Sequence, residues 1–273
     1  MWLPEPDSIR QFIEGVRMYQ EGNGQDQRTC EPGSTGAQEA DDKKTIAELE
    51  KKVVFLQKKL QIVGSVTRHD VLNQMTAIVG YNELLGMMVE DPKFRSFLEK
   101  EKFALDKIRR QFQFAKDYQN IAVEPPRWQN IRNLVSRVSE GFTLNQVRII
   151  AETGPASVLA DPLLDRVFHH LFENALRHGE IVTGITISLQ QHGNSGLLLV
   201  ENNGTGIPVA DKEKIFERGY GKGTGWGLFL AREILAVTGM TISETGVPGK
   251  GVRFEITLPP GSFRIDGGES PAL

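Results

Sequence analysis

Val-Glu-Asn-Asn-Gly-Thr-Gly-Ile-Pro, residues 200–208, directly follows a predicted strand at 196–201 and is the stretch that decides the fold. Gly204 and Gly206 allow the backbone to approach a ligand closely or to adopt a positive φ. Taken alone, the stretch is also consistent with an ordinary turn after an edge strand. The segments before and after it are needed to choose between a ligand loop and a turn.

A second glycine-rich stretch, residues 219–228, is Gly-Tyr-Gly-Lys-Gly-Thr-Gly-Trp-Gly-Leu and opens a predicted helix at 225–237. Repeated glycines before a helix N-terminus form a phosphate cradle, because the free N–H groups and the positive end of the helix dipole face the anion. A mobile loop is the alternative, and mobility is compatible with phosphate binding.

The third stretch, residues 170–178, is His-Leu-Phe-Glu-Asn-Ala-Leu-Arg-His on a predicted helix at 162–178. The side-chain oxygen of Asn174 is a hard, neutral ligand that suits Mg²⁺ already bound to phosphates. Arg177 and His178 add donors that could face a nucleotide. A helix with one buried face and polar flanks is the alternative interpretation.

The surrounding pattern predicts an α/β layered domain from about residue 127. Strands are expected at 147–152, 185–190, 196–201 and 252–258, with the two helices over one face of a mixed sheet. Glu124-Pro125-Pro126 interrupts a helical pattern and marks a domain boundary before this domain.

The N-terminal half is predicted to be helical. Apolar residues alternate at spacings of three and four, which indicates a parallel coiled coil rather than a lone amphipathic helix; they are Ile46, Leu49, Val53, Leu56, Leu60 and Val63. The helical pattern continues to a turn at Glu90-Asp91-Pro92, and a second helical pattern follows. Two such helices do not close a core alone, so we expect a homodimer that forms an antiparallel four-helix bundle.

Arg-His-Asp-Val-Leu-Asn, residues 68–73, lies within the first helix. His69 and Asn73 share a helix face, and the carboxylate of Asp70 can reach the imidazole from the side. Such a carboxylate fixes the tautomer of a neutral imidazole and takes up its proton, which suits a histidine that attacks phosphorus. When the motif is taken alone, a solvated surface histidine is the better explanation of it.

Composition limits the remaining possibilities. The chain has 273 residues, of which 39% are hydrophobic and 25% charged, and this suits one or two globular domains. We expect a cytoplasmic protein, because there is no long apolar run, no signal-peptide pattern and a single cysteine, Cys30. A net charge of −3 gives no reason to expect nucleic acid as a partner. A short amphipathic helix is predicted within residues 1–20, and the polar composition of 21–42 predicts a flexible linker.

Together these motifs resemble the two-component sensor histidine kinases, whose ATP-binding domain belongs to the gyrase, chaperone and mismatch-repair ATPase superfamily. The resemblance covers about residues 44–260. It implies that His69 is the phospho-acceptor, Asp70 its acidic neighbour, and Asn73 the residue that directs a water in the reverse, phosphatase reaction. Asn174 matches the Mg²⁺-binding asparagine. The resemblance also implies which residues contact ATP. They lie on the predicted helix at 162–178, in the two glycine-rich stretches, which match the family's two glycine boxes, and in or next to the phenylalanine box at 215–217. These positions are Arg177, His178, Asn202, Gly204, Gly206, Ile207, Phe216, Arg218, Lys222, Gly223, Thr224, Gly225, Gly227 and Leu228.

Two positions depart from the family pattern. Asn202 stands where the family has an aspartate that accepts a hydrogen bond from the adenine amino group. A neutral amide there should weaken that bond by roughly 1–2 kcal/mol and ATP affinity by roughly tenfold or more. His170 stands where the family has asparagine. Because no carboxylate lies one turn before Asn174, the pattern favours transfer to a side chain over activation of water.

The resemblance implies an α+β fold with a coiled coil and phosphotransfer hairpin at 43–122, an ATP-binding domain at 127–262 and a tail at 263–273. ATP with Mg²⁺ would lie beneath a lid of about residues 209–225, and the domain would swing on Pro125-Pro126 to phosphorylate His69. The phosphoryl group would pass to an aspartate of a response-regulator receiver domain.

Three alternatives remain open at this point. One is a pseudokinase or a phosphatase-dominant protein in which Asn202 weakens ATP binding and Asn73 carries the remaining activity. Another is a dimeric scaffold with no enzymatic activity. The third is a stand-alone ATPase, which the histidine-bearing hairpin and the missing hydrolytic carboxylate disfavour.

Overall fold

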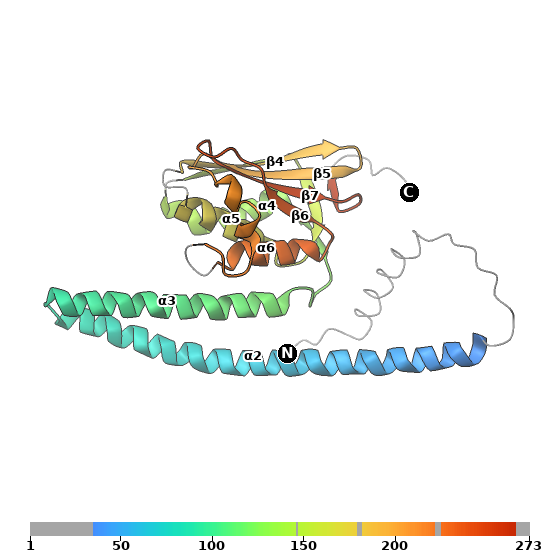
Figure 1. Cartoon of the computed structure of the whole chain (residues 1–273), viewed down its shortest axis with the longest axis horizontal. Coiled ribbons are helices and arrows are strands. Elements are labelled where there is room, and N and C mark those ends of the chain that lie inside the picture. The colour runs from blue at the N-terminus through green and yellow to red at the C-terminus, as the bar shows by residue number, and fades with distance from the viewer. Residues whose placement is uncertain (1–34, 146, 179–181, 222–224, 266–273) are drawn as a thin grey trace. The chain divides into compact units, whose positions relative to one another are not determined.

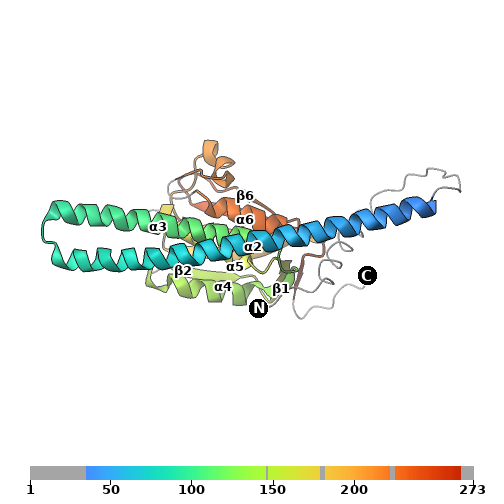
Figure 2. The ribbon, with the colours of Figure 1, turned by 90° about the horizontal axis from the view of Figure 1, so that it is seen from below.

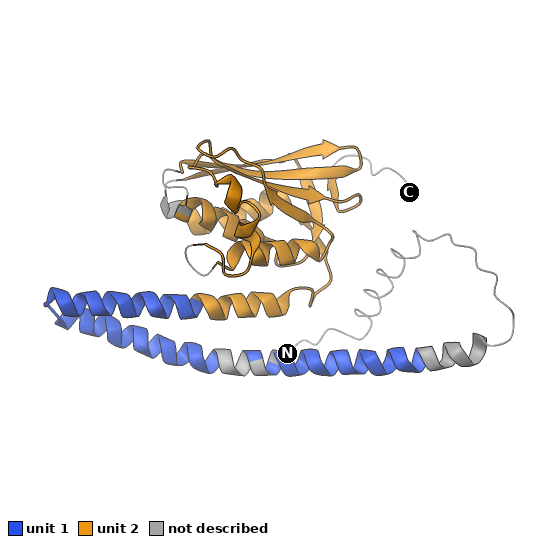
Figure 3. Cartoon of the chain, viewed as in Figure 1, with its two compact units in different colours: residues 1–109 blue, residues 110–273 orange. Residues whose placement is uncertain are grey.

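The structure is a computed structural model that describes residues 35–145, 147–178, 182–221 and 225–265. It divides into two compact units, residues 1–109 and residues 110–273, coloured separately in Figure 3. The predicted helix within residues 1–20 and most of the predicted linker lie outside the described residues.

The first unit is a helical hairpin, as predicted. Helix α2 spans Thr35–Met88, and helix α3 spans Pro92–Asn120, of which residues up to 109 belong to this unit. The two helices run antiparallel and side by side (Figure 1 and Figure 2). The Asp91 carboxylate accepts a hydrogen bond from the Lys93 N–H at 2.7 Å and so caps α3.

Few side chains are buried inside this single hairpin. Among the described side chains of this hairpin, Met75 and Leu105 are the buried apolar ones. The Asn82 amide donates to the Leu98 carbonyl at 3.1 Å and to Glu101 at 3.2 Å. The described residues of the predicted seam are about half exposed; they are Ile46, Leu49, Val53, Leu56 and Leu60. The homodimer that would cover them stays a prediction.

Helix α2 begins earlier than expected. The predicted linker extended to residue 42, but the structure is helical from Thr35. Alanine, glutamine and glutamate at 37–40 are good helix formers, and a polar surface does not prevent helix formation where a long helix already follows. Among the described helices, none has an 18-residue window apolar enough to cross a membrane.

The second unit contains a five-stranded mixed sheet with helices on one face (Figure 1). The strand order is β2-β4-β5-β7-β6, in which β2 is parallel to β4 and the other neighbours are antiparallel. The strands are β2 Arg148–Glu152, β4 Gly184–His192, β5 Ser195–Asn202, β6 Thr241–Glu244 and β7 Val252–Leu258. The helices are α4 Ile131–Ser139, α5 Leu164–His178 and α6 Gly227–Ala236. The predicted α+β fold class is confirmed.

The core lies between this sheet and the helices. Apolar residues on α5 recur at helical spacing and are buried on one face, and they are Leu164, Val167, Phe168, Leu171, Phe172 and Ala175. They pack in one cluster with sheet residues such as Ile187, Val200 and Phe254. Each large side chain of this kind stabilises the fold by about 1.5–3 kcal/mol when fully buried. This packing fixes α5 against the sheet and therefore fixes the polar face that α5 presents on its other side.

Several short elements were not predicted. A second, three-stranded sheet has the order β1-β3-β8, with β1 Arg127–Asn130, β3 Ala156–Ala160 and β8 Phe263–Ile265. The 3₁₀ turns are Glu140–Asn145, Val209–Asp211 and Lys214–Phe216.

Two predicted boundaries differ from those that the structure shows. The first three residues of the predicted tail form β8, which pairs with β3. The division between the compact units lies between Arg109 and Arg110, before the Pro125-Pro126 boundary that we predicted, because the end of α3 contacts α5.

Candidate active site

A cavity of about 590 Å³ opens in the second unit. Its walls come from the last turns of α3, the polar face of α5, the ends of β5 and β7, and the segment that leads into α6. The residues that line it are Arg110, Gln113, Phe114, Asp117, Arg166, His169, His170, Glu173, Asn174, Ala175, Arg177, Asn202, Gly206, Ile207, Pro208, Asp211, Ile215, Tyr220, Gly221, Gly225, Trp226, Gly227, Leu228 and Val252.

The sheet end of the cavity is mainly apolar and carries one amide. Asn202 is the last residue of β5 and pairs in register with Val252 of β7. Its Oδ1 accepts a hydrogen bond from the Gly204 N–H at 3.0 Å. The side chain of Asn203 is engaged elsewhere, because it accepts from the backbone N–H groups of Thr183 and Gly184 and donates to the Thr183 hydroxyl. Asn203 therefore anchors the start of β4, and Asn202 is left to face the cavity.

Two positions at this site require glycine, because there is no room for a Cβ and because their φ is positive. Gly206 has φ +79°, and a Cβ there would lie 3.0 Å from the carbonyl oxygens of Val247 and Gly251. Gly225 has φ +66°, and a Cβ there would lie 2.4 Å from the carbonyl carbon of Gly219. Any side chain at either position forces the backbone to move. At both glycines the backbone therefore has a fixed path at the edge of the cavity.

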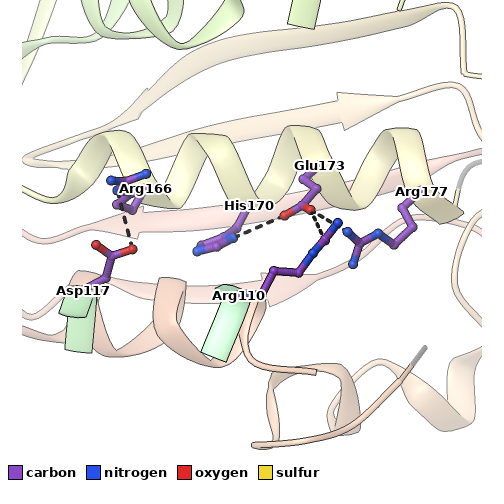
Figure 4. Close-up of polar contacts among 6 residues, drawn as sticks. All are labelled: Arg110, Asp117, Arg166, His170, Glu173 and Arg177. Atoms are coloured by element: carbon purple, nitrogen blue, oxygen red, sulfur yellow. Dashed lines mark hydrogen bonds and ion pairs between the residues drawn. The ribbon is translucent and has the colours of Figure 1, made fainter. Parts of the chain in front are cut away.

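Helix α5 presents a row of charged side chains to the cavity (Figure 4). Glu173 accepts from Arg110 Nη1 at 2.9 Å and from Arg177 Nη2 at 2.6 Å. His170 Nδ1 lies 3.8 Å from the same carboxylate. The nearby imidazole of His170 and the positive charge of Arg110 hold the pKa of Glu173 below its usual range, although burial opposes this.

A second ion pair ties α3 to α5. Asp117 is buried and lies 3.6 Å from Arg166. Between the two ion pairs, Phe114 packs its ring 4.6 Å from that of Trp226, next to Gly227. The cavity is thus lined by three arginines and by three carboxylates, those of Asp117, Glu173 and Asp211, so its formal charges balance. The guanidinium groups can donate hydrogen bonds to the oxygens of a polyanion such as a triphosphate.

Two neighbouring histidines of α5, His169 and His170, also line the cavity. His169 packs against Phe142 at 5.2 Å between ring centroids, and burial lowers its pKa. Possible ligand atoms of His169, His170 and Glu173 lie within 4.8 Å of one another. Ligands of a tetrahedral zinc are about 3.3 Å apart, and Glu173 already accepts from two arginines, so we assign no metal to these three residues.

The structure brings most of the predicted nucleotide contacts together. Eight of them line the cavity: Asn174, Arg177, Asn202, Gly206, Ile207, Gly225, Gly227 and Leu228. Three do not. Gly204 contributes its N–H to Asn202, Phe216 is buried against Phe254, and the guanidinium of Arg218 lies 5.9 Å from the centroid of the Trp226 ring. Lys222, Gly223 and Thr224 lie outside the described residues, as does the side chain of His178 at the end of α5.

The sequence did not point to the charged partners on α3 and α5. Glu173 and Arg177 are four residues apart on one helix, and this spacing is the signal that could have paired them. Arg110 and Asp117 carry no such signal, because their partners lie far away in the sequence.

In the first unit, His69 is 75% exposed on α2. Its Nδ1 lies 3.2 Å from Asp70 Oδ1, and the Asn73 amide nitrogen lies 3.3 Å from Nδ1 and 3.5 Å from Nε2. In the Nδ1–H tautomer the imidazole donates to Asp70, and the lone pair of Nε2 lies within reach of the Asn73 amide. Asp70 and Asn73 therefore contact the same imidazole, as the helical spacing predicted.

Comparison with known proteins agrees with this geometry. The family described as "Histidine kinase-, DNA gyrase B-, and HSP90-like ATPase" matches residues 160–262, which contain α5 and both glycine stretches. The expected resemblance to the two-component sensor histidine kinases is confirmed.

The relatives of this ATPase domain include named sensor kinases. The alginate biosynthesis sensor protein KinB of Pseudomonas aeruginosa is 40% identical over 101 residues, which cover 35% of this chain and 17% of KinB. The signal transduction histidine-protein kinase AtoS of Escherichia coli is 29% identical over 208 residues, which cover 70% of this chain and 33% of AtoS. The chain thus spans a third or less of the length of these two relatives.

Among solved structures, full-length ShkA in complex with AMPPNP superposes with a TM-score of 0.55 and 19% identity. The superposition covers 73% of this chain and 46% of ShkA. This similarity supports the fold.

Proposed function

We propose that the chain is the catalytic core of a sensor histidine kinase that transfers the γ-phosphoryl group of ATP to His69. The observation that carries the proposal is the pairing of an ATPase-family cavity in one unit with an exposed His69–Asp70 pair in the other. A cavity alone would fit an ATPase, and a surface histidine alone would fit no particular enzyme. A cytoplasmic location follows from the use of ATP as donor.

The residues around the cavity fit a triphosphate. The glycine loops leave backbone at the surface where a Cβ would not fit, and Arg110, Arg166 and Arg177 supply positive charge. We assign Asn174 to Mg²⁺, because its amide oxygen is a neutral ligand on the face of α5 that lines the cavity. Mg²⁺ would neutralise charge on the phosphates. Arg218, just before the second glycine stretch, and Lys222, within it, remain proposed contacts to the terminal phosphates.

At the acceptor, the Nε2 lone pair of His69 attacks the γ-phosphorus and forms a P–N bond while the bond to the β–γ bridging oxygen breaks. ADP leaves with that oxygen. Asp70 accepts the hydrogen bond from Nδ1–H, stabilises the positive charge that develops on the ring and can take up the proton. Most of the catalytic effect then comes from positioning and charge neutralisation.

We further propose that the chain works as a homodimer and passes the phosphoryl group to a response-regulator aspartate. The half-exposed seam on α2 supports the dimer, because isolated helices with such a seam leave apolar surface in water. The amide of Asn73 beside the imidazole also supports phosphatase activity toward the same partner, since it can position a water at the surface of the bundle.

Incubation with γ-labelled ATP and Mg²⁺ tests the kinase assignment. The chain should acquire an acid-labile label that is absent from His69→Gln and retained in His192→Gln, which removes an exposed histidine on β4. Label that persists in His69→Gln would contradict the proposal.

A further inference from the structure

A buried carboxylate organises the loop between β6 and β7, residues 245–251. Glu244 is the last residue of β6, and its side chain is fully buried. Its Oε1 accepts from the backbone N–H of Gly246 at 2.9 Å and from that of Arg253 at 3.2 Å. A Cβ at Gly246 would lie 2.6 Å from the same oxygen, so the loop passes directly over the carboxylate. Glu244 therefore sets the path of this loop.

Lys212 is the charged partner of this carboxylate. It follows the 3₁₀ turn Val209–Asp211, and its Nζ lies 2.9 Å from Glu244 Oε2. The same ammonium group donates to the Gly246 carbonyl oxygen. The side chain of Lys212 is 19% exposed, so both members of the ion pair are largely shielded from water. Lys212 thus fastens the segment that follows the first glycine stretch to the β6–β7 loop.

The segment that precedes Lys212 carries part of the cavity wall. The lining residues on it are Gly206, Ile207, Pro208 and Asp211. The β6–β7 loop also holds the start of this segment, because the Gly249 N–H donates to the Thr205 carbonyl at 2.7 Å. Gly206 packs against the same loop so closely that a Cβ there would lie 3.0 Å from the Val247 carbonyl oxygen. The lining residues therefore lie between two points of attachment, one at 205–206 and one at Lys212.

The attachment at Lys212 also bears on the second glycine stretch. Asp211, the residue before Lys212, accepts a hydrogen bond from the Tyr220 hydroxyl at 2.6 Å. Both Asp211 and Tyr220 line the cavity. If Lys212 were released, Asp211 would lose its neighbouring anchor, and the contact between the two stretches would loosen with it.

We propose that Lys212 and Glu244 are positioning residues of the nucleotide site, which hold the first glycine stretch in place for ATP. The inference rests on the proposed function, because it takes this cavity to be the nucleotide site. Neither residue is among the described residues that line the cavity, so both act through the backbone between them. A wall that is already fixed loses little conformational entropy when a ligand binds, and affinity is higher for that reason.

Positioning explains this ion pair better than stabilisation does. Burying two charges costs desolvation energy that offsets much of their attraction, so a buried ion pair is often no more stabilising than apolar side chains of the same size. Charge-assisted hydrogen bonds, however, are short and directional. An ammonium group held by both Glu244 and the Gly246 carbonyl oxygen therefore has a defined place in the fold.

Calorimetric titration with ATP and Mg²⁺ tests the proposal, with the His69→Gln chain as parent so that no transfer to His69 occurs. Lys212→Met alone leaves a buried carboxylate without its counter-charge and should lower the midpoint of thermal unfolding by roughly 10 °C. Lys212→Met combined with Glu244→Gln removes both charges, and the glutamine oxygen can still accept the two backbone N–H bonds. We expect this double variant to unfold near the parent's midpoint and yet to bind ATP roughly tenfold more weakly, which corresponds to ordering about one residue again on binding.

Lys250→Met is the matched control, because it removes one positive charge from an exposed position on the same loop. It should leave both the unfolding midpoint and the Kd for ATP unchanged. Hydrogen exchange without nucleotide gives a second readout. The Asp211 N–H, which donates to the Pro208 carbonyl at 3.0 Å, should exchange faster in the double variant than in Lys250→Met.

Three results would contradict the proposal in different ways. Parental ATP affinity in the double variant, or parental exchange at Asp211, overturns the positioning role and leaves the kinase proposal intact. Weak binding that accompanies a lowered unfolding midpoint in the double variant assigns the pair to fold stability and overturns it as well. Failure of the parent itself to bind ATP overturns the cavity as a nucleotide site, and this inference with it.

Discussion

Arg110 Nη1 donates to Glu173 Oε1 over 2.9 Å, and this bond joins the end of α3 to the residue that immediately precedes Asn174. The same oxygen accepts from Arg177 at 2.6 Å. One carboxylate thus partly neutralises two guanidinium groups at the edge of the cavity. The charge that a triphosphate would meet depends on whether Glu173 is ionised and in place.

Glu173→Gln should therefore tighten nucleotide binding. Amide replacement keeps the shape of the side chain and removes its negative charge, so Arg110 and Arg177 attract phosphates more strongly. We expect Kd to fall by about threefold to tenfold at low salt, with a steeper salt dependence. Glu152→Gln on β2 makes the same change of charge away from the cavity lining and should leave Kd unchanged. Weaker binding by Glu173→Gln would mean that the carboxylate mainly holds the arginines in position.

The second glycine stretch leaves no room for a Cβ at Gly225, and this can be tested by substitution. Gly225→Ala introduces a Cβ 2.4 Å from the Gly219 carbonyl carbon as well as a side chain at φ +66°, so it should destabilise the unit by about 3 kcal/mol and abolish nucleotide binding. Gly219→Ala is the matched control, because it has φ +86° but nothing within 4 Å of the new Cβ. It should cost about 1–2 kcal/mol. Thermal unfolding and nucleotide titration measure the stability and the binding of the two variants. Equal effects of Gly225→Ala and Gly219→Ala would show that the backbone at Gly225 does not stay close to the Gly219 carbonyl carbon.

The lowered pKa of His169 leads to a prediction of how the free energy of unfolding depends on pH. Burial, followed by the charge of His170, lowers its folded pKa below the ordinary 6.5. The unfolded chain therefore binds more protons in this range, so the unfolding free energy is fully retained above about pH 6.5 and falls as the pH drops through the lowered pKa. Denaturant unfolding of His169→Phe should show a shallower acid loss, whereas His192→Gln should resemble the parent. The account of His169 fails if the parent and His169→Phe lose stability in parallel.

The seam on α2 predicts which apolar side chains hold a dimer. Leu56 lies on the seam and is 59% exposed in the single chain, whereas Phe55 lies off the seam and is 64% exposed. Leu56→Lys would bury a charge between helices, and it should weaken dimerisation by at least roughly tenfold. Phe55→Lys removes at least as much exposed apolar surface and should not. Sedimentation equilibrium distinguishes the two, and equal dissociation would contradict the coiled-coil register.

The long, periodic elements could be predicted from the sequence. Helix α5 and strands β4, β5 and β7 were predicted near their observed positions, because each buries one continuous face. Strand β1 was missed because Arg-Trp-Gln-Asn has no apolar alternation and is held only by its pairing with β3. The β8 segment was taken for a tail because it has only three residues and is held by its pairing with β3.

Of the candidate site, too, only a part could be predicted from the sequence. Asn174, Arg177 and Asn202 follow a recognisable order of motifs, and the structure brings them to one cavity. The contribution of α3 was hidden, because Arg110 and Asp117 fall within a pattern that indicates only a helix of the hairpin. Their partners on α5 lie on the far side of several intervening elements. The orientation of the Asn202 amide was equally out of reach, since it depends on one hydrogen bond in a glycine loop.

The measurement that tests the central claim most directly is the location of the phosphoryl group after the chain meets a purine triphosphate and Mg²⁺. Phosphorus NMR with fragmentation mass spectrometry at neutral pH identifies both the residue and the ring nitrogen. The account predicts one phosphohistidine, at Nε2 of His69, that disappears in Asn174→Ala. Free phosphate without phosphohistidine, or a phosphoryl group on any other residue, would contradict it.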